Sequence, residues 1–323
     1  MMQARRRIVV SAAAAMALPG MVGQAQAQRR PRVGISMPEA QNSFFNALGK
    51  SLVDQLREAG ADPVLLAANG DANEQINNIN DLVSQQVDAL IVNPLNTEGP
   101  APGVKRAFDA GIPVFMVART LDAKYSSWWK AFIGIDFVHI GTAKGRWVLE
   151  NTKPGKVGML LATSGAVSMM EQERSFRAVV EPAGYKVVFA QHSPQTRERG
   201  LKLSEDALVA NPDISVMYAG SDDLGLGAAQ AAKAAGRQGK IAILGLNGTP
   251  PALAAVHNGE MAMTVLLDAG AWGKTVIATV MDFLRAKKEP PRFIPLDFAI
   301  VTQKNAYDHI PAALRERLGV KPR

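Results

Sequence analysis

The chain has 323 residues, of which 47% are hydrophobic, and this length can bury a sizeable core and suits two domains. The formal charge is +7, but three arginines belong to the N-terminal leader and the other basic residues are scattered, which argues against nucleic-acid binding. The absence of cysteine excludes disulfides, thiolate metal sites, a cysteine nucleophile and the acylated cysteine of a lipoprotein.

The N-terminal segment has the pattern of a cleaved secretory signal. The basic run Arg5–Arg7 is followed by an Ala-rich apolar stretch over 8–22 and by a small-x-small sequence at 25–27. The apolar stretch is too short to span a membrane and contains a Pro-Gly pair, which argues against a retained anchor. We therefore predict that segment 1–27 is a signal peptide, exported by the general or by the twin-arginine route.

After the leader, short β-rich runs alternate with segments of helical period. The expected strands of the first half are 32–37, 63–68, 88–93, 113–118 and 131–135. The expected strands of the second half are 156–161, 185–190, 214–219, 240–245 and 261–266. Repeated β-α-β units predict an α/β protein with two Rossmann-like lobes, each a parallel sheet flanked by helices.

The turn Asn42–Phe45 follows the first expected strand and opens a helical pattern. Ligands of open α/β sheets bind beyond the carboxyl ends of the strands, so this turn is a candidate binding surface. Phe45 continues the apolar face formed by leucines at helical spacing and is expected to anchor the helix. Phe44 is then free to point elsewhere.

The sequence lacks complete motifs of enzymes and of metal sites. Gly270–Thr275 ends like a phosphate loop, but Asp268 stands where the first glycine is required. The four histidines show no ligand spacing, and no serine has a nucleophile-elbow pattern. Asp222 and Asp223 are a candidate carboxylate pair, yet adjacent acids at a helix start are expected to be caps. The sequence predicts no enzyme, no metal and no cofactor.

Polar side chains follow strands in both halves of the chain. They include Asn42, Asn93, Arg119, Ser221 and Asn247. Side chains at the strand ends of both halves are expected to converge on one cleft, where a small ligand would bind.

Several runs together resemble the ribose-type periplasmic sugar-binding proteins. They are the leader, the Asn-x-Phe-Phe turn at 42–45, Ile91–Pro94 and Gly245–Pro250. The resemblance extends from about residue 32 to 302 and implies the type I periplasmic binding protein fold, with two lobes joined by a three-crossing hinge. It also implies the substrate-binding protein of an ABC importer, which captures a small carbohydrate or polyol and presents it to the inner-membrane permease by hinge closure.

By the same resemblance, the first lobe is 32–135 plus 268–297, and the second lobe is 136–267 plus 298–323. The protein is expected to be a periplasmic monomer without a cofactor or nucleic-acid partner. A sensory protein that docks on a membrane receptor is an alternative, because it would use the same ligand site. A cytoplasmic repressor would need a helix-turn-helix headpiece where this chain has its leader.

The resemblance further implies two walls of ligand-binding residues. The first lobe supplies Asn42, Phe44, Phe45, Asn93 and Arg119, which match the family's pattern. The second lobe supplies Gln172, Ser221, Asn247 and Leu267, where the family usually has Arg, Asn, Asp and a polar amide. Ala118 also departs from the family, which usually has an Asp directly before the arginine.

These departures change the charge of the expected site. Ionised carboxylates bind neutral sugars through charge-assisted hydrogen bonds, and two of them are replaced, at Ala118 and Asn247. An unpaired buried Arg119 is costly and would favour an anionic ligand. A sugar acid or other small hydroxylated carboxylate is therefore a second candidate. The alternative is that Asp136, Glu171 or Asp268 pairs with the arginine.

Overall fold

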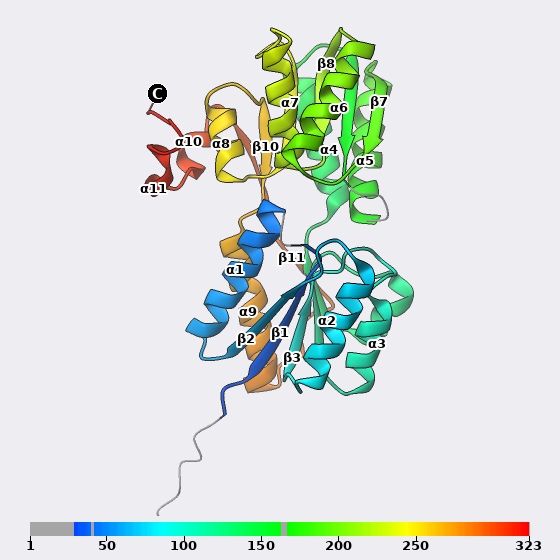
Figure 1. The fold of residues 1–323 in the computed structure, drawn as a ribbon, viewed down its shortest axis with the longest axis vertical. Coiled ribbons are helices and arrows are strands. Elements are labelled where there is room, and N and C mark those ends of the chain that lie inside the picture. Colours follow the sequence, from blue (N-terminus) through cyan, green and yellow to red (C-terminus); the bar gives the residue numbers. More distant parts are fainter. Residues whose placement is uncertain (1–28, 40–41, 163–166, 323) are drawn as a thin grey trace, which may run out of the picture.

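The computed structural model describes residues 29–39, 42–162 and 167–322. The predicted signal peptide 1–27 lies outside the described residues. Within them, none of the helices combines the length and the apolar character that crossing a membrane requires. Figure 1 shows two α/β lobes stacked along the long axis of the molecule.

The first lobe is built on a six-stranded sheet with the order β11-β5-β4-β3-β1-β2, in which every pair is parallel. Its strands are β1 (Arg32–Met37), β2 (Asp62–Ala67), β3 (Ala89–Val92), β4 (Val114–Ala118), β5 (Ala131–Gly134) and β11 (Phe293–Pro295). Its helices are α1 (Ser43–Glu58), α2 (Ala72–Ser84), α3 (Ala101–Asp109), the 3-10 helix η1 (Ala123–Trp128) and α9 (Ala269–Ala286). Helices α1 and α9 cover one face of the sheet, and α2 and α3 cover the other (Figure 1).

The second lobe has the strand order β12-β10-β9-β8-β6-β7, and β12 alone of these strands runs antiparallel to its neighbour. Its strands are β6 (Lys156–Leu161), β7 (Lys186–His192), β8 (Ile214–Ala219), β9 (Ala242–Asn247), β10 (Met263–Leu266) and β12 (Ala299–Thr302). Its helices are α4 (Phe137–Asn151), α5 (Val167–Val180), η2 (Glu181–Ala183), α6 (Arg197–Ala210), α7 (Asp222–Ala234), α8 (Pro250–His257), α10 (Ala306–His309) and α11 (Ala312–Arg315).

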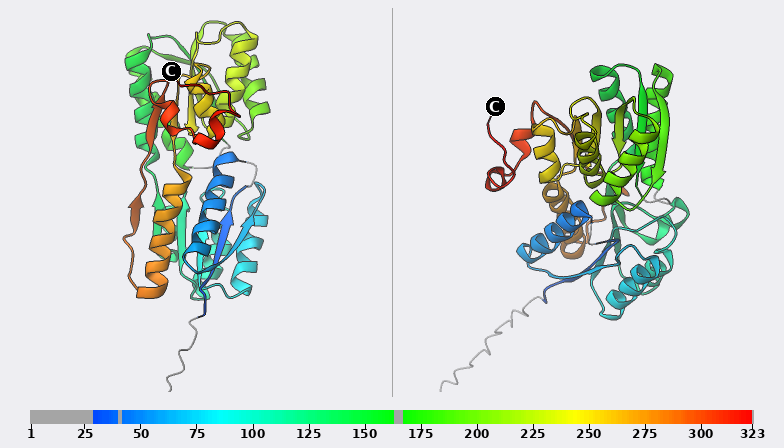
Figure 2. Two further views of the ribbon diagram at one scale, coloured as in Figure 1. Left: turned by 90° about the vertical axis from the view of Figure 1, so that its left-hand side faces the viewer. Right: turned by 45° about the horizontal axis from the view of Figure 1, so that its top comes forward.

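The chain passes between the two sheets three times, after β5, after β10 and between β11 and β12 (Figure 2). The predicted α/β fold with two Rossmann-like lobes and a three-crossing hinge is therefore confirmed. The ten strands expected from the sequence form, with ends shifted by at most two residues. The short edge strands β11 and β12 were not expected, because three or four residues carry too little periodicity to be recognised.

The N-terminal turn forms helix α1 as the sequence indicates. Asn42 is the N-cap residue, and its side-chain oxygen accepts hydrogen bonds from the backbone N–H groups of Phe44 and Phe45 at 3.0 and 3.1 Å. The predicted apolar face is buried in the largest core cluster, with Phe45 and leucines 48, 52 and 56. That face packs against α9, which returns from the second lobe.

The C-terminal segment after β12 packs on the second lobe. Ile310 and Val320 are buried in the same apolar cluster as helices α7 and α8. The Nε2 atom of His257 lies 2.9 Å from the backbone oxygen of Lys321. This segment closes the outer edge of the second lobe, as the position of the C-terminus in Figure 1 shows.

Candidate functional site

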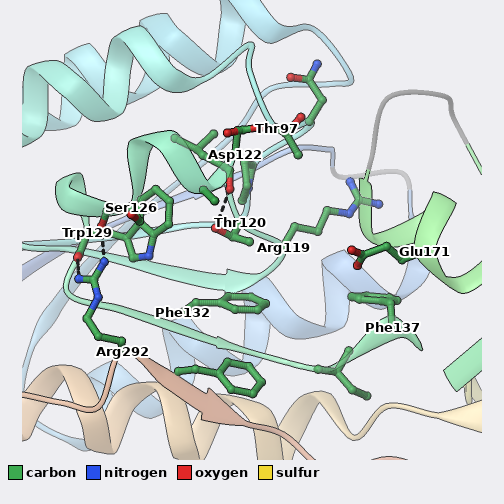
Figure 3. Close-up of a pocket in the computed structure, with 16 residues that line it drawn as sticks. Thr97, Arg119, Thr120, Asp122, Ser126, Trp129, Phe132, Phe137, Glu171 and Arg292 are labelled. Carbon is green, nitrogen blue, oxygen red and sulfur yellow. Dashed lines mark hydrogen bonds between the residues drawn. The ribbon is translucent and has the colours of Figure 1, made fainter. Parts of the chain in front are cut away.

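A cavity of about 520 Å3 lies where the carboxyl ends of β3, β4 and β5 face the start of the second lobe. Arg119, which follows β4, and Glu171, on α5 of the second lobe, reach into the same end of it (Figure 3). Phe137, at the start of α4, also lines this end. The cavity therefore occupies the edge at which ligands bind in open α/β folds.

Arg119 is the cationic group at the end of this cavity that faces the second lobe, and it is only 8% exposed. Its guanidinium lies 4.7 Å from the centre of the Phe45 ring, in cation–π geometry, and its Nη1 donates a 3.3 Å hydrogen bond to the Leu95 carbonyl. Burial lowers the pKa of Arg119 to about 10, against the opposing effect of the Glu39 carboxylate. The side chain is therefore cationic at neutral pH.

The backbone before Arg119 is strained. Ala118 has a φ of +61°, in the left-handed region that residues with a Cβ rarely adopt. The N–H of Arg119 donates a 2.6 Å hydrogen bond to the Val117 carbonyl and closes a three-residue turn around Ala118. Such conformations cost about 1–3 kcal/mol and gather at functional sites. Here the turn directs Arg119 off the strand end into the cavity.

The ion pairs of the described residues do not include Arg119. Two of the carboxylates offered by the sequence are helix caps, since Asp136 accepts from the Val138 N–H and Asp268 accepts from the first N–H groups of α9. Glu171 shares the cavity with Arg119 without pairing to it. Glu39, which sequence reasoning missed, acts on Arg119 from a distance, and burial raises the pKa of its carboxyl.

Asn93 is fully buried at the end of β3, and neither atom of its side-chain amide has a hydrogen-bond partner among the described residues. Its backbone is held by Gln75 of α2, whose Nε2 donates to the Asn93 carbonyl at 2.9 Å and whose Oε1 accepts from the Leu95 N–H at 2.8 Å. A buried amide without partners costs about 1–3 kcal/mol. The Asn93 side chain is not among the residues that line the cavity, whereas the adjacent Pro94 is. Gln75 is a positioning residue that its sequence position, within an amphipathic helix, did not reveal.

Of the two phenylalanines, Phe45 has its predicted anchoring role, whereas Phe44 does not line the cavity. Phe44 does not face the cavity; it is 4% exposed and packs edge-on against Trp272 of α9 at 5.3 Å between ring centres. Phe45 does anchor the apolar face of α1, but its ring also supports Arg119. Sequence spacing could not separate these roles, because the positions of Trp272 and Arg119 decide them.

The predicted residues of the second lobe are mostly engaged within that lobe. Ser221 is the N-cap of α7 and accepts from the Leu224 N–H. Leu267 is buried in the core, and Asn247 is half-buried at the end of β9 with a φ of +122°. Gln172 is fully buried, and its Oε1 accepts from the Tyr218 hydroxyl while its Nε2 is unpartnered among the described residues.

A buried polar network behind this wall was not predicted. Lys144 of α4 is fully buried, donates a 2.9 Å hydrogen bond to the Ala219 carbonyl, and places its ammonium 3.9 Å from the centre of the Tyr218 ring. Asp222 is not the helix cap that the sequence suggested. It is fully buried and accepts 2.6 Å hydrogen bonds from the Thr249 N–H and the Thr264 hydroxyl.

Lys144 should make stability depend on pH. Burial lowers the pKa of Lys144 to about 7, against the opposing charge of Asp222. Above that pH the unfolded chain keeps a proton that the folded chain has lost, so the free energy of unfolding should rise with pH up to the normal lysine pKa. We expect Lys144→Met to reduce this slope by about 1.4 kcal/mol per pH unit between pH 8 and 10.

Urea unfolding at a series of pH values measures that slope. The exposed Lys233 of α7 provides the control, since Lys233→Met should leave the slope unchanged. Equal slopes for Lys144→Met and the parent protein would show that the pKa of Lys144 is not lowered in the folded state.

Comparison with known protein families identifies the family of this chain. The family described as periplasmic binding protein domain matches residues 33–288. The chain belongs to this family. The family prediction made from the sequence is confirmed, and members of the family are substrate-binding proteins of ABC transporters and not enzymes.

Curated relatives and solved structures agree with this membership. The chain is 27% identical to the ribose import binding protein RbsB of Bacillus subtilis (strain 168), over 79% of this chain and 82% of the relative. It is 32% identical to the galactofuranose-binding protein YtfQ of Escherichia coli (strain K12), over 60% of this chain and 63% of the relative. A crystal structure of a galactofuranose binding protein superposes with a TM-score of 0.82 and 25% identity, covering 90% of this chain and 99% of the other.

Proposed function

We propose that this periplasmic binding protein captures a small carbohydrate or polyol between its lobes and presents it to an ABC permease. The observation that carries the proposal is the position of Arg119 and Asn93 at neighbouring strand ends, where Arg119 lines the cavity and Asn93 is buried next to the lining residue Pro94. Asn93 offers an unpartnered buried amide, and Arg119 offers a buried guanidinium without an ion pair among the described residues. Hydroxyl groups of a ligand accept from the guanidinium and bond to both ends of the amide. The printed names of the relatives, ribose import and galactofuranose binding, support the same ligand class.

A sugar acid is the second candidate, and Arg119 is the observation that favours it. The residue before it is Ala118 and not an acid, and Glu39, whose charge opposes the lowering of the Arg119 pKa, forms no ion pair with it among the described residues. A ligand carboxylate would supply the missing partner and form charge-assisted, two-pronged hydrogen bonds with the guanidinium. A neutral ligand would leave the buried cation without a counter-charge, which costs binding free energy.

We further propose that the lobes, 32–135 with 268–297 and 136–267 with 298–323, move as units about the three crossings. Ser43, at the start of α1, donates a 3.1 Å hydrogen bond to the carboxylate of Asp223, at the start of α7. This contact joins helix starts from opposite lobes beside the cleft. The proposal includes export after removal of segment 1–27 and function as a monomer.

A thermal-shift screen of the mature protein tests the proposal. Neutral sugars, polyols and sugar acids are compared at one concentration, because a ligand that binds only the folded state raises the melting temperature. We expect one class to give a clear, concentration-dependent rise. No rise with any member of the three classes would refute the proposed ligand chemistry.

A further inference from the structure

The cavity extends well beyond the end that holds Arg119. Figure 3 shows Arg119 and Glu171 at one end, Trp129 and Arg292 at the other, and Phe132 along the space between them. Its volume of about 520 Å3 exceeds the space that a single sugar ring fills at Arg119. The ligand class proposed above therefore leaves a large part of this cavity unexplained.

The floor of the extension is aromatic and partly exposed. Phe132 of β5 and Phe293 of β11 stack at 5.4 Å between ring centres, with 28° between their planes, and Phe293 is 44% exposed. Gly134 makes room for this arrangement, since a Cβ there would lie 2.2 Å from Cζ of Phe132. Trp129 and Ile135 complete an apolar lining. The absence of a side chain at Gly134 thus lets the Phe132 ring lie along the cavity.

Several polar groups of the cavity rim form hydrogen bonds within the protein itself. The Asp122 carboxylate caps η1, and the Asn96 side-chain oxygen accepts from the N–H groups of the turn that follows it. The Thr120 hydroxyl donates to the Leu121 carbonyl. Arg292 donates to the backbone carbonyls of Ser126, Trp129 and Lys130. These internal bonds reduce the number of polar groups that could bind a second sugar ring, whereas the aromatic floor is not covered by other side chains to the same extent, since Phe293 is 44% exposed.

We propose that the natural ligand is a glycoside with an apolar, ring-sized aglycone. Its hydroxylated sugar part lies at Arg119, and its aglycone stacks on Phe132 and Phe293. Stacking on these rings removes apolar surface from water and uses offset ring contacts that a small sugar alone cannot make. This inference rests on the proposed function and specifies the substrate class of the same site.

Matched glycosides test the inference by isothermal titration calorimetry. The probes are the methyl and phenyl β-glycosides of glucose, galactose, ribose and glucuronic acid, with lactose as a disaccharide of galactose. For the sugar that binds, we expect the phenyl glycoside to have a Kd at least about tenfold lower than the methyl glycoside. Gly134→Ala pushes the Phe132 ring off its position, and Phe293→Ala removes the second ring. Both variants should bring the phenyl glycoside to the affinity of the methyl glycoside.

Phe108 of α3 provides a matched control, because it is also 44% exposed but does not line the cavity. Phe108→Ala should keep the full preference for the phenyl glycoside. If methyl glycosides bind and phenyl glycosides bind no better, or lactose alone gains affinity, the aglycone inference fails while the proposed function stands. If neither these glycosides nor any neutral sugar, polyol or sugar acid of the thermal-shift screen binds, the proposed function itself fails.

Discussion

Asp222→Ala is expected to lower the free energy of unfolding by about 3–5 kcal/mol at pH 7.5. The carboxylate joins three elements of the second lobe, because it lies on α7 and accepts from Thr249 at the start of α8 and from Thr264 of β10. Gly245 leaves the space that the carboxylate fills, since a Cβ there would lie 2.4 Å from Asp222 Oδ1. Alanine would leave a buried N–H and a buried hydroxyl without their acceptor.

Urea unfolding followed by circular dichroism measures this loss. Asp223→Ala is the matched control, because Asp223 is adjacent but half-buried, and its replacement should cost no more than about 0.5 kcal/mol. The pH profile gives a second readout. Burial raises the pKa of Asp222 to about 6, so the folded state binds its proton more tightly and the stability of the parent protein should fall from about pH 4 to pH 6. An Asp222→Ala variant as stable as the parent protein would show that the Asp222 carboxylate does not stabilise the packing of α7, α8 and β10.

Arg119→Met is expected to remove about 2–3 kcal/mol of binding free energy for a sugar acid, a loss of about a hundredfold in affinity. Methionine keeps an apolar chain over the Phe45 ring but cannot donate hydrogen bonds or balance a negative charge. A neutral sugar loses only donor bonds, so its affinity should fall by about tenfold. The difference between the two losses identifies the ligand's charge.

Calorimetric titration of the ligand found by screening measures both losses. Arg106 of α3 is exposed and lies away from the cavity, so Arg106→Met should bind as the parent protein does. If an Arg119→Met protein folds normally and binds with unchanged affinity, Arg119 does not contribute to ligand binding.

The sequence predicted the elements whose pattern is local. The strand runs and the apolar face of α1 carry their own periodicity, and both form as expected. The edge strands β11 and β12 could not be recognised, because they form by pairing with β5 and β10. Their own composition does not indicate a strand.

The candidate site was predictable in position and less so in detail. Strand ends identified Asn93 and Arg119, but burial of Lys144 and Gln75 depends on tertiary partners, and these residue types are usually exposed. The same holds for Asp222, which a helix-start pattern assigned to capping. The departures of the second wall from the family pattern stay a prediction, and its side chains are mostly engaged within their own lobe.

A small hydroxylated ligand is expected to bind between the lobes and to bring them together. Because the chain has no cysteine, Ser127→Cys on η1 and Arg197→Cys on α6 allow one label to be placed in each lobe at exposed positions. The distance between the two labels is then measured with and without saturating ligand. We predict a shorter distance with ligand and no change in the Arg119→Met variant at the same concentration of an acid ligand. An unchanged distance in the parent protein, with binding verified by calorimetry, would show that the ligand does not bring the lobes together.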